Sequence, residues 1–234
     1  MKQFNQFESM DFTKEIIKEL KQSKKLFVIF STFGEREAML IYDKISLLKN
    51  EMGDLIDEFF LSHRRAGTEE EMTEKKAVEA YDGTHILICN DYQVPDMNAE
   101  KGKGADMRRM LHYINTNFAG DNNKEDIILV FLDADVVPEH FGSHFVLGLA
   151  GAVLKGSDFA KASFWRAMGR VKKFVAQPLF SIINHPDLNA LQNFAYPLSG
   201  EVGGLLSFFN KVHFWQIYGV ETGINIDSCL GDYT

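Results

Sequence analysis

Two aspartates separated by one alanine end a long apolar run in this sequence. The run is ILVFLDADVVP, residues 128–138, and the aspartates are Asp133 and Asp135. Hard divalent cations such as Mg²⁺ and Mn²⁺ prefer carboxylate oxygens, and one or two carboxylates commonly bridge such an ion to substrate phosphates. A D-x-D sequence at a strand end supplies this arrangement, with one carboxylate on the metal and the other on metal-bound water or a ribose hydroxyl. A solvated turn in which Asp135 caps a helix would use the same tripeptide, but its place after the apolar run favours a metal site.

A loop of glycines and lysines, EKGKGADM at 100–107, is a second candidate site. Gly102 and Gly104 free the backbone to approach an anion, and Lys101 or Lys103 adds positive charge. The loop leads into a helix N-terminus, which favours phosphate. It has neither the spacing of an ATPase P-loop nor that of a dinucleotide-binding loop. These residues fit two interpretations, a phosphate-binding loop and a flexible basic surface loop.

Three further charged residues stand within two positions of a glycine. Arg170 follows Gly169, and its guanidinium suits a carboxylate or a phosphate. Glu201 lies in LSGEVGG and Glu221 in YGVETG. Each glutamate is a candidate helix cap, surface acid or site residue.

Alternating apolar and helical segments must position these residues. In the first part of the chain, strands are predicted at 25–32, 55–63, 84–91 and 126–135, and helices at 11–23, 34–50, 68–81 and 105–118. Asp11 is the expected cap of the first of these helices. In the second part, helices are predicted at 137–156 and 169–184 and a strand at 158–165. This rhythm predicts an α/β fold with a doubly wound, mainly parallel sheet and flanking helices. In such sheets ligands bind beyond the carboxyl ends of the strands, where Asp133 and Asp135 lie.

Composition narrows the function further. The chain has 234 residues, a net charge of −8 and 33 acidic against 25 basic residues, which argues against a general nucleic-acid-binding surface. Its two cysteines form no C-x-x-C pair, and no run of about 20 apolar residues predicts a membrane span. We expect a cytoplasmic protein with one domain in three parts: an N-terminal helix at 1–24, one half at 25–138 and a second at 139–234.

Five stretches, in this order, resemble the GT-A glycosyltransferases that make glucosyl-3-phosphoglycerate and its mannosyl relatives. The resemblance covers about residues 25–230. The stretches are GKGADM at 102–107, FLDADVVP at 131–138, GRVKKFVAQPL at 169–179, YPLSGEVGG at 196–204 and YGVETGINID at 218–227.

The resemblance implies a donor site for a nucleotide diphosphate sugar, UDP- or GDP-linked, in the first half. Asp133 and Asp135 would hold a divalent metal, Mg or Mn, on the diphosphate. Lys103 would contact the nucleotide. The residues implied to cup the base are Ser31, Thr32, Phe33 and Glu35, and those implied to lie beside the donor sugar are Ser199, Gly200 and Glu201.

The resemblance also implies a small anionic acceptor, glycerate or 3-phosphoglycerate, in the second half. Its binding residues would be Gly169, Arg170, Lys172, Tyr218 and Glu221. Asp135, Arg170 and Glu221 would be the catalytic residues of a metal-dependent transfer of glucose or mannose that retains the anomeric configuration. The resemblance leaves a homodimer open.

Three departures from the family pattern keep alternatives open. STFGERE stands where the family commonly reads P-x-L-N-E, and Lys172 stands where a threonine is usual. The family also supplies a metal-binding histidine after Y-G-V-E, whereas this sequence has no histidine after His213. The alternatives are a nucleotidyltransferase and a catalytically impaired relative that binds sugar nucleotides.

Overall fold

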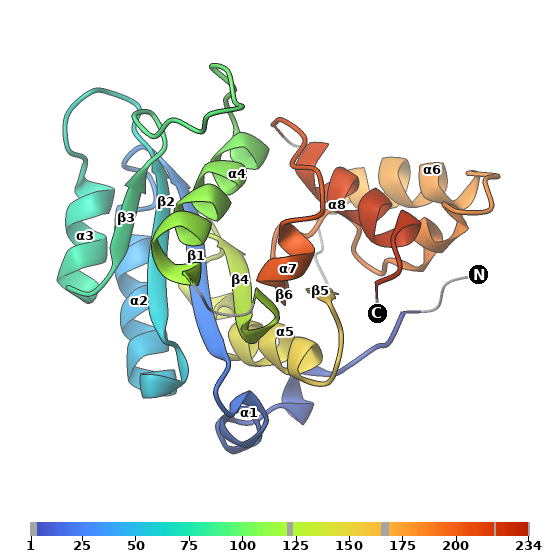
Figure 1. Ribbon diagram of the computed structural model, residues 1–234, viewed down its shortest axis with the longest axis horizontal. Coiled ribbons are helices and arrows are strands. Elements are labelled where there is room, and N and C mark those ends of the chain that lie inside the picture. Colours follow the sequence, from blue (N-terminus) through green and yellow to red (C-terminus); the bar gives the residue numbers. More distant parts are fainter. Residues whose placement is uncertain (1–3, 121–123, 165–168, 218, 234) are drawn as a thin grey trace.

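The computed structural model describes residues 4–120, 124–164, 169–217 and 219–233. Within them, six strands form one sheet in the order β3-β2-β1-β4-β6-β5 (Figure 1). The strands are β1 (Lys25–Phe33), β2 (Glu58–Arg64), β3 (His85–Ile88), β4 (Ile127–Asp133), β5 (Phe159–Lys161) and β6 (Val202–Leu205). The helices are α1 (Lys14–Lys21), α2 (Ala38–Met52), α3 (Met72–Ala80), α4 (Lys103–Ile114), α5 (His144–Leu154), α6 (Gln177–Ser181), α7 (Leu206–Phe209) and α8 (Gly219–Leu230), joined in places by short 3-10 and π-helical turns.

The sheet is mainly parallel, as predicted. β1 runs parallel to β2 and β4, β2 runs parallel to β3, and β6 runs antiparallel to β4 and β5. Its central strands are buried on both faces, so their apolar residues alternate between two cores. In β4, Val130 and Leu132 pack into one core and Leu129 and Phe131 into the other. A continuous apolar run is what a strand covered on both faces requires.

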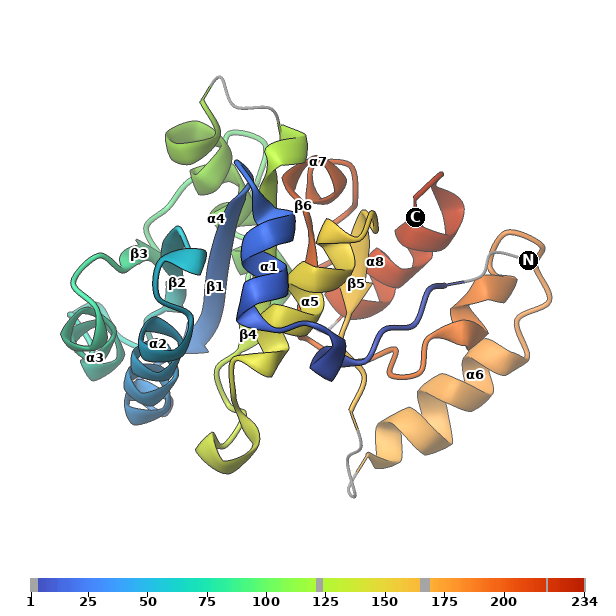
Figure 2. The same ribbon diagram turned by 90° about the horizontal axis from the view of Figure 1, so that it is seen from below.

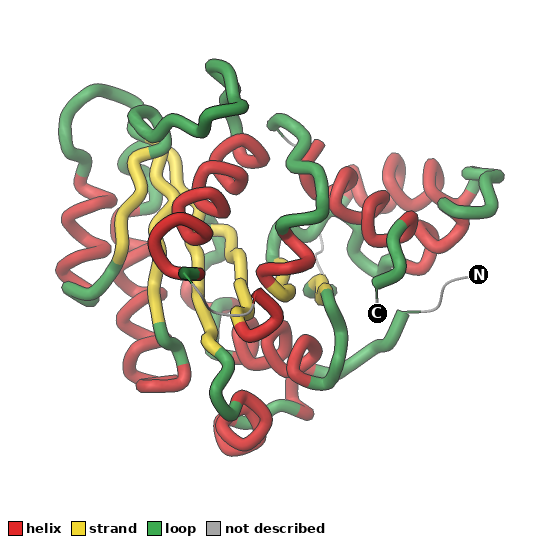
Figure 3. Tube along the Cα trace, in the orientation of Figure 1, coloured by secondary structure: helices red, strands yellow, loops and turns green. Residues whose placement is uncertain are grey.

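Helices cover both faces of the sheet (Figure 3). One core joins the sheet to α1, α2, α3 and α5, and Figure 2 views this face with α1 and α5 in front. The other core joins the sheet to α4, α7 and α8. The segment 139–234 supplies β5 and β6 to the sheet that 25–138 begins. The doubly wound architecture follows from these two layers.

Some predicted boundaries were wrong. The cap of the first helix is Thr13 rather than Asp11, because the Thr13 hydroxyl accepts a hydrogen bond from the backbone N–H of Ile16 at 3.4 Å. Asp11 instead ends a separate 3-10 turn. The helix expected from residue 137 begins at His144, since Pro138–His140 forms its own 3-10 turn. The strand expected over 158–165 ends at Lys161 within the described residues.

Among the labelled strands and helices, three had no counterpart in the sequence prediction. β6 runs from the end of YPLSGEVGG to Leu205, and its two glycines are not typical of a strand. α7 follows it directly, and α8 begins at the YGVE stretch. At Gly203 an added Cβ would lie 3.0 Å from Leu149 Cβ, and at Gly204 it would lie 2.9 Å from the Asp158 carbonyl. The glycines of β6 therefore permit close packing against α5 and against Asp158, the residue before β5.

The segment around α6 lies apart from the sheet in both ribbon views (Figures 1 and 2). Phe180, Leu191 and Cys229 form a small core that ties it to α8. Its outer side leaves Phe174 and Ile182 exposed. None of the helices in the described part of the chain is long and apolar enough to cross a membrane.

Candidate active site

The two aspartates lie at the carboxyl end of β4, as the fold class predicted. Asp133 is the last residue of β4, and Asp135 is exposed in the turn that follows. Across the sheet, Asp133 is the register partner of Ser31 near the end of β1. The D-x-D stretch and the STFGERE stretch therefore meet at one edge of the sheet.

Lys103, the first residue of α4, joins two carboxylates. Its Nζ lies 2.5 Å from Asp133 Oδ1 and 3.0 Å from Glu221 Oε1, in the first turn of α8. The three side chains are 17%, 31% and 11% exposed, respectively, so this is a largely buried ion-pair cluster. Burial alone would lower the pKa of Lys103, but the two carboxylates outweigh it and the pKa is raised. Lys103 therefore remains a cation in this cluster at neutral pH.

Gly200 closes this cluster from the side of the SGE turn. An added Cβ at Gly200 would lie 2.2 Å from both Asp133 Oδ2 and Lys103 Nζ, closer than any side chain tolerates. The neighbouring Ser199 hydroxyl donates to Glu201 Oε2 at 2.7 Å. Burial, and the charge of Asp133, raise the pKa of Glu201. One residue from each of the GKG, D-x-D, SGE and YGVE stretches, namely Lys103, Asp133, Gly200 and Glu221, thus belongs to one cluster.

The glycines of the GKG loop make room for the chain rather than only for an anion. Gly102 caps α4 at a φ of +93°, a conformation that favours glycine. At Gly104 an added Cβ would lie 1.8 Å from the Trp215 carbonyl oxygen, and the Gly104 N–H donates to Ile217 O at 3.4 Å. The start of α4 therefore packs directly against the residues that precede α8.

Lys44 of α2 supports the D-x-D turn. It was not predicted from the sequence, because it belongs to no motif. It is 1% exposed, its Nζ donates to the carbonyl of Ala134, and it lies 5.3 Å from the centre of the Phe141 ring. Burial lowers the pKa of Lys44 to about 8, against the opposing charges of Asp135, Glu37 and Asp133. A charged residue at helical spacing among apolar ones (Ile41, Lys44, Ile45, Leu48) was the available signal.

A second unpredicted network anchors α4 to β2. Arg64, the last residue of β2, donates through Nε to Asp106 Oδ2 at 2.8 Å and makes a second contact with Oδ1. Arg109 donates to Asp106 Oδ1 at 3.2 Å. Because Asp106 lies one turn after Lys103, this fork fixes the helix end that presents Lys103. Such paired guanidinium–carboxylate contacts combine charge with orientation.

The four residues expected to cup the base lie at the end of β1 and in the loop after it, in different settings. Phe33 is 57% exposed, whereas the Thr32 hydroxyl is buried against His63 Nδ1 at 2.8 Å. Glu35 accepts a hydrogen bond from the N–H of Met72 at 3.0 Å and so ties the loop to the start of α3. Their role toward a base stays a prediction, and the Thr32 hydroxyl already has one hydrogen-bond partner in His63.

The acceptor residues are placed only in part. Lys172 lies 4.5 Å above the ring of Tyr196, at the start of the YPLSGE turn, so the GRV and SGE stretches are in contact. Gly169 is half-buried and Arg170 is exposed beside it. No hydrogen bond or ion pair joins Arg170 to another described residue. Tyr218 lies outside the described residues.

The two aspartates fit an open metal site. The exposed carboxylate of Asp135 offers hard oxygen ligands, while Asp133 already has one oxygen on Lys103. In the described part of the chain, no three His, Cys, Asp or Glu side chains are grouped to hold a metal ion. A divalent cation that completes its coordination with water and phosphate oxygens needs only one or two carboxylates. Asp135, with Asp133 beside it, would hold such an ion.

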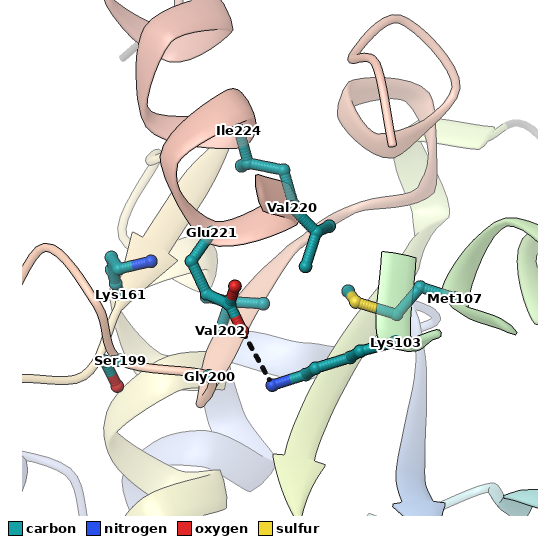
Figure 4. Close-up of a pocket in the computed structure, with 9 residues that line it drawn as sticks. All are labelled: Lys103, Met107, Lys161, Ser199, Gly200, Val202, Val220, Glu221 and Ile224. Atoms are coloured by element: carbon teal, nitrogen blue, oxygen red, sulfur yellow. Dashed lines mark ion pairs between the residues drawn. The ribbon is translucent and has the colours of Figure 1, made fainter. Parts of the chain in front are cut away.

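A pocket opens beside the ion-pair cluster (Figure 4). Residues of α4, β5, the SGE turn and α8 line it, among them Lys103, Ser199, Gly200 and Glu221. Lys161 of β5 also lines it and was not predicted, because a single lysine in a short strand belongs to no motif. Of the residues predicted for the donor sugar, Ser199 and Gly200 line this pocket, and of those predicted for the acceptor, Glu221 does.

The fold and the arrangement of this site define a class. The mixed six-stranded sheet with helices on both faces is the GT-A glycosyltransferase fold, and the resemblance stated from the sequence is confirmed. In sequence, the chain is similar to glucosyl-3-phosphoglycerate synthase from Petrotoga mobilis, with 29% identity over 231 residues, and to that from Mycolicibacterium smegmatis, with 28% over 222. These matches cover 92% and 89% of this chain but 64% and 65% of the relatives, so the chain spans about two thirds of their length. No family model matches it.

Solved structures give the same likeness. Glucosyl-3-phosphoglycerate synthase from Mycobacterium tuberculosis with Mn²⁺, UDP and phosphoglyceric acid superposes with a TM-score of 0.71 at 26% identity, over 93% of this chain and 68% of the other. The same enzyme with Mn²⁺, UDP and glucosyl-3-phosphoglycerate gives 0.72 at 25% identity, over 97% and 71%. It is also known with Mg²⁺ and UDP, at a TM-score of 0.72 and 26% identity, over 93% and 69%. Divalent cations therefore accompany the nucleotide in these relatives.

Proposed function

We propose that this chain carries the catalytic site of a retaining glucosyltransferase that moves glucose from UDP-glucose to 3-phosphoglycerate with a divalent metal. One observation carries the proposal: the ammonium of Lys103 lies between Asp133 and Glu221, beside Gly200. This contact unites four stretches that are far apart in the sequence. The ligands named for the mycobacterial structures support the choice of UDP, glucose and phosphoglycerate over GDP, mannose and glycerate.

The residues at the end of β4 would bind the donor diphosphate. When bound there, a divalent cation would neutralise the charge of the departing nucleotide diphosphate. Lys103 would add a second positive charge from the N-terminus of α4, where backbone N–H groups also favour phosphate. Because Lys103 is held by Asp133 and Arg64 holds Asp106 one turn later, this charge is positioned before the donor arrives. Groups fixed in this way need little reorganisation during the reaction.

The residues on the opposite side would position the acceptor. Arg170 is exposed next to Gly169 and is suited to hold a carboxylate or phosphate. Glu221 faces the pocket from α8 and can accept a hydrogen bond from a sugar or acceptor hydroxyl. Retention places the acceptor hydroxyl on the face from which the diphosphate leaves, so no enzyme nucleophile is required. Rate enhancement would then come from placing the two substrates and stabilising the departing charge.

A donor-by-acceptor screen tests this proposal. Purified protein with Mn²⁺ would be given UDP-glucose, GDP-glucose or GDP-mannose, each with glycerate or 3-phosphoglycerate, and release of the nucleoside diphosphate would be measured. We expect release with UDP-glucose and 3-phosphoglycerate, and loss of that release in Asp135→Asn. The anomeric configuration of the product would be read by NMR. Turnover only with another pair would correct the substrates, and an inverted product would overturn retention.

A second candidate is a relative that binds the sugar nucleotide without transferring the sugar. It is favoured by the absence, in the described part of the chain, of a third side chain grouped with the two aspartates. Calorimetry separates the two: nucleotide binding without turnover on any acceptor supports the second candidate. A protein that binds no nucleotide diphosphate excludes both.

A further inference from the structure

Lys161 presents an unpaired ammonium to the pocket. The residue as a whole is half-buried, but its Nζ is enclosed and has no hydrogen-bond partner among the described residues. It is the last residue of β5 and the register partner of Val202, and the next residue, Ala162, donates to the Glu201 carbonyl at 3.0 Å. Lys161 therefore stands next to the SGE turn, and Figure 4 shows its Nζ pointing toward Glu221.

An enclosed ammonium without a partner is costly, so its surroundings should contain the group that completes it. Each of the two acidic neighbours already has one carboxylate oxygen engaged. Glu221 is paired with Lys103 at 3.0 Å, and Glu201 accepts from Ser199 at 2.7 Å. We therefore expect a ligand in the pocket to supply the hydrogen-bond partner of Lys161.

The charges around Lys161 select the chemistry of that group. Even when Lys103 and Lys161 are both protonated, they face three carboxylates, Asp133, Glu201 and Glu221, so the cluster has no excess of positive charge. Beside Lys161 itself, an additional phosphate or carboxylate would be repelled by Glu201 and Glu221. A hydroxyl group carries no charge and both donates and accepts, so it can bind Lys161 and a carboxylate at once.

Apolar side chains also line the pocket. Met107, Val202, Val220 and Ile224 lie among the charged side chains, with Met107 near Lys103 and Val202 near Glu221. A pyranose ring has hydroxyls around its edge and C–H groups on its faces, which matches a pocket lined by both polar and apolar groups. As it stands the pocket holds about one water molecule, so side chains must shift to admit a ring. We expect the Lys103–Glu221 ion pair to separate, because a bound diphosphate would compete with Glu221 for the Lys103 ammonium.

We propose that Lys161 binds a hydroxyl of the donor hexose, and so is a sugar-recognition residue of this site. The proposal rests on the proposed function and adds to it one residue that no motif identified. Lys161 would act on the sugar and not on the nucleotide. Removing it should therefore weaken sugar-nucleotide binding and leave binding of the free nucleotide unchanged.

The test compares two ligands on three proteins. Binding of UDP-glucose and of UDP, both with Mn²⁺, would be measured by calorimetry on the wild type, Lys161→Met and Lys155→Met. Lys155 is an exposed lysine after α5 and serves as the matched control. We expect Lys161→Met to weaken UDP-glucose binding about tenfold or more, as for loss of a hydrogen bond from a charged donor. Its affinity for UDP should stay within about twofold of the wild type.

The outcomes are separable. Equal weakening of UDP binding and UDP-glucose binding would overturn the proposal, because Lys161 would then act on the nucleotide or on the fold. Unchanged binding of both ligands would also overturn it. If the wild type binds neither ligand, nor GDP and GDP-mannose, the proposed function itself fails before any variant is compared. If Lys161→Met does not fold, Lys161→Gln takes its place, since it keeps a hydrogen-bond donor on a side chain one atom shorter. Lys161→Gln should weaken UDP-glucose binding by less than about tenfold and leave UDP binding unchanged. The proposal would be contradicted if Lys161→Gln lost no affinity for UDP-glucose relative to UDP.

Discussion

The Nζ of Lys103 lies 2.5 Å from Oδ1 of Asp133, so the first residue of α4 is joined to the last residue of β4. The contact connects a helix N-terminus to a strand end, the two places in an α/β sheet where anionic ligands bind. It also means that Asp133 is partly committed before any metal arrives. Asp135 is left as the carboxylate most open to a cation.

Replacing Lys103 tests whether this contact serves both stability and function. Lys103→Met should lower the free energy of unfolding by about 3 kcal/mol, because Asp133 and Glu221 lose their shared cation in a largely buried place. It should also lower kcat/KM by roughly 10² to 10³. Urea denaturation and the transferase assay measure the two effects. Lys101→Met, an exposed lysine two residues earlier, is the control, and an equal effect in both variants would contradict the assignment.

Replacing Gly200 tests the close packing of the SGE turn. In Gly200→Ala the new Cβ would meet Asp133 and Lys103 at 2.2 Å, so the cluster must move. We expect a loss of roughly 1–3 kcal/mol in stability and weaker binding of UDP with Mn²⁺. Gly67→Ala is the matched control, since nothing lies within 4 Å of its added Cβ. Wild-type nucleotide binding by Gly200→Ala would show that the cluster is not the binding site.

Removing the metal ligand tests the role of Asp135. Asp135→Asn should weaken Mn²⁺-dependent UDP binding by more than about 10²-fold, a larger effect than an outer-shell partner of a metal ligand usually has. EDTA should reduce wild-type binding to the same level and should change the variant little. Calorimetry measures both, with Asp54→Asn, at an exposed position after α2, as the control. Wild-type Mn²⁺ dependence in Asp135→Asn would move the metal elsewhere.

The pH dependence of stability tests the burial of Lys161. Burial lowers the pKa of Lys161 from its ordinary 10.5 to about 7, against the opposing charge of Glu221. Between these values the unfolded chain binds more protons than the folded one, so the free energy of unfolding rises with pH. We expect the wild type to gain stability relative to Lys161→Met from about pH 7 to about pH 10. Urea denaturation across this range checks it, and parallel curves for the two proteins would show that the Lys161 ammonium is not buried.

Much of the fold was readable because the strands are buried on both faces. The apolar runs at β1, β2 and β4 contain so many large apolar side chains that these strands must be covered on both faces. β6 was missed because its two glycines carry no side chain to reveal a strand, and their small size is required by α5 and by Asp158 before β5. Thr13 displaced Asp11 as a cap because capping depends on the backbone angles of one residue, which composition does not reveal.

The site residues could be predicted from the sequence only where they belong to a motif. Asp133, Lys103, Gly200 and Glu221 were predicted from a family resemblance and meet in one cluster. Lys161 reaches the pocket from a strand at the edge of the sheet and has no characteristic neighbours in the sequence. The roles of individual residues, the division into a donor half and an acceptor half, the homodimer and the cytoplasmic location stay predictions.

The contact between Gly104 and Trp215 has a consequence for how this protein can change over evolution. The backbone at 104 touches the carbonyl at 215 with no space for a methyl group. A side chain acquired at 104 would displace the segment before α8, and with it Glu221. Residues 102–104 and 215–217 should therefore vary together among homologues, although more than a hundred positions separate them, while the exposed side of α6 is free to diverge.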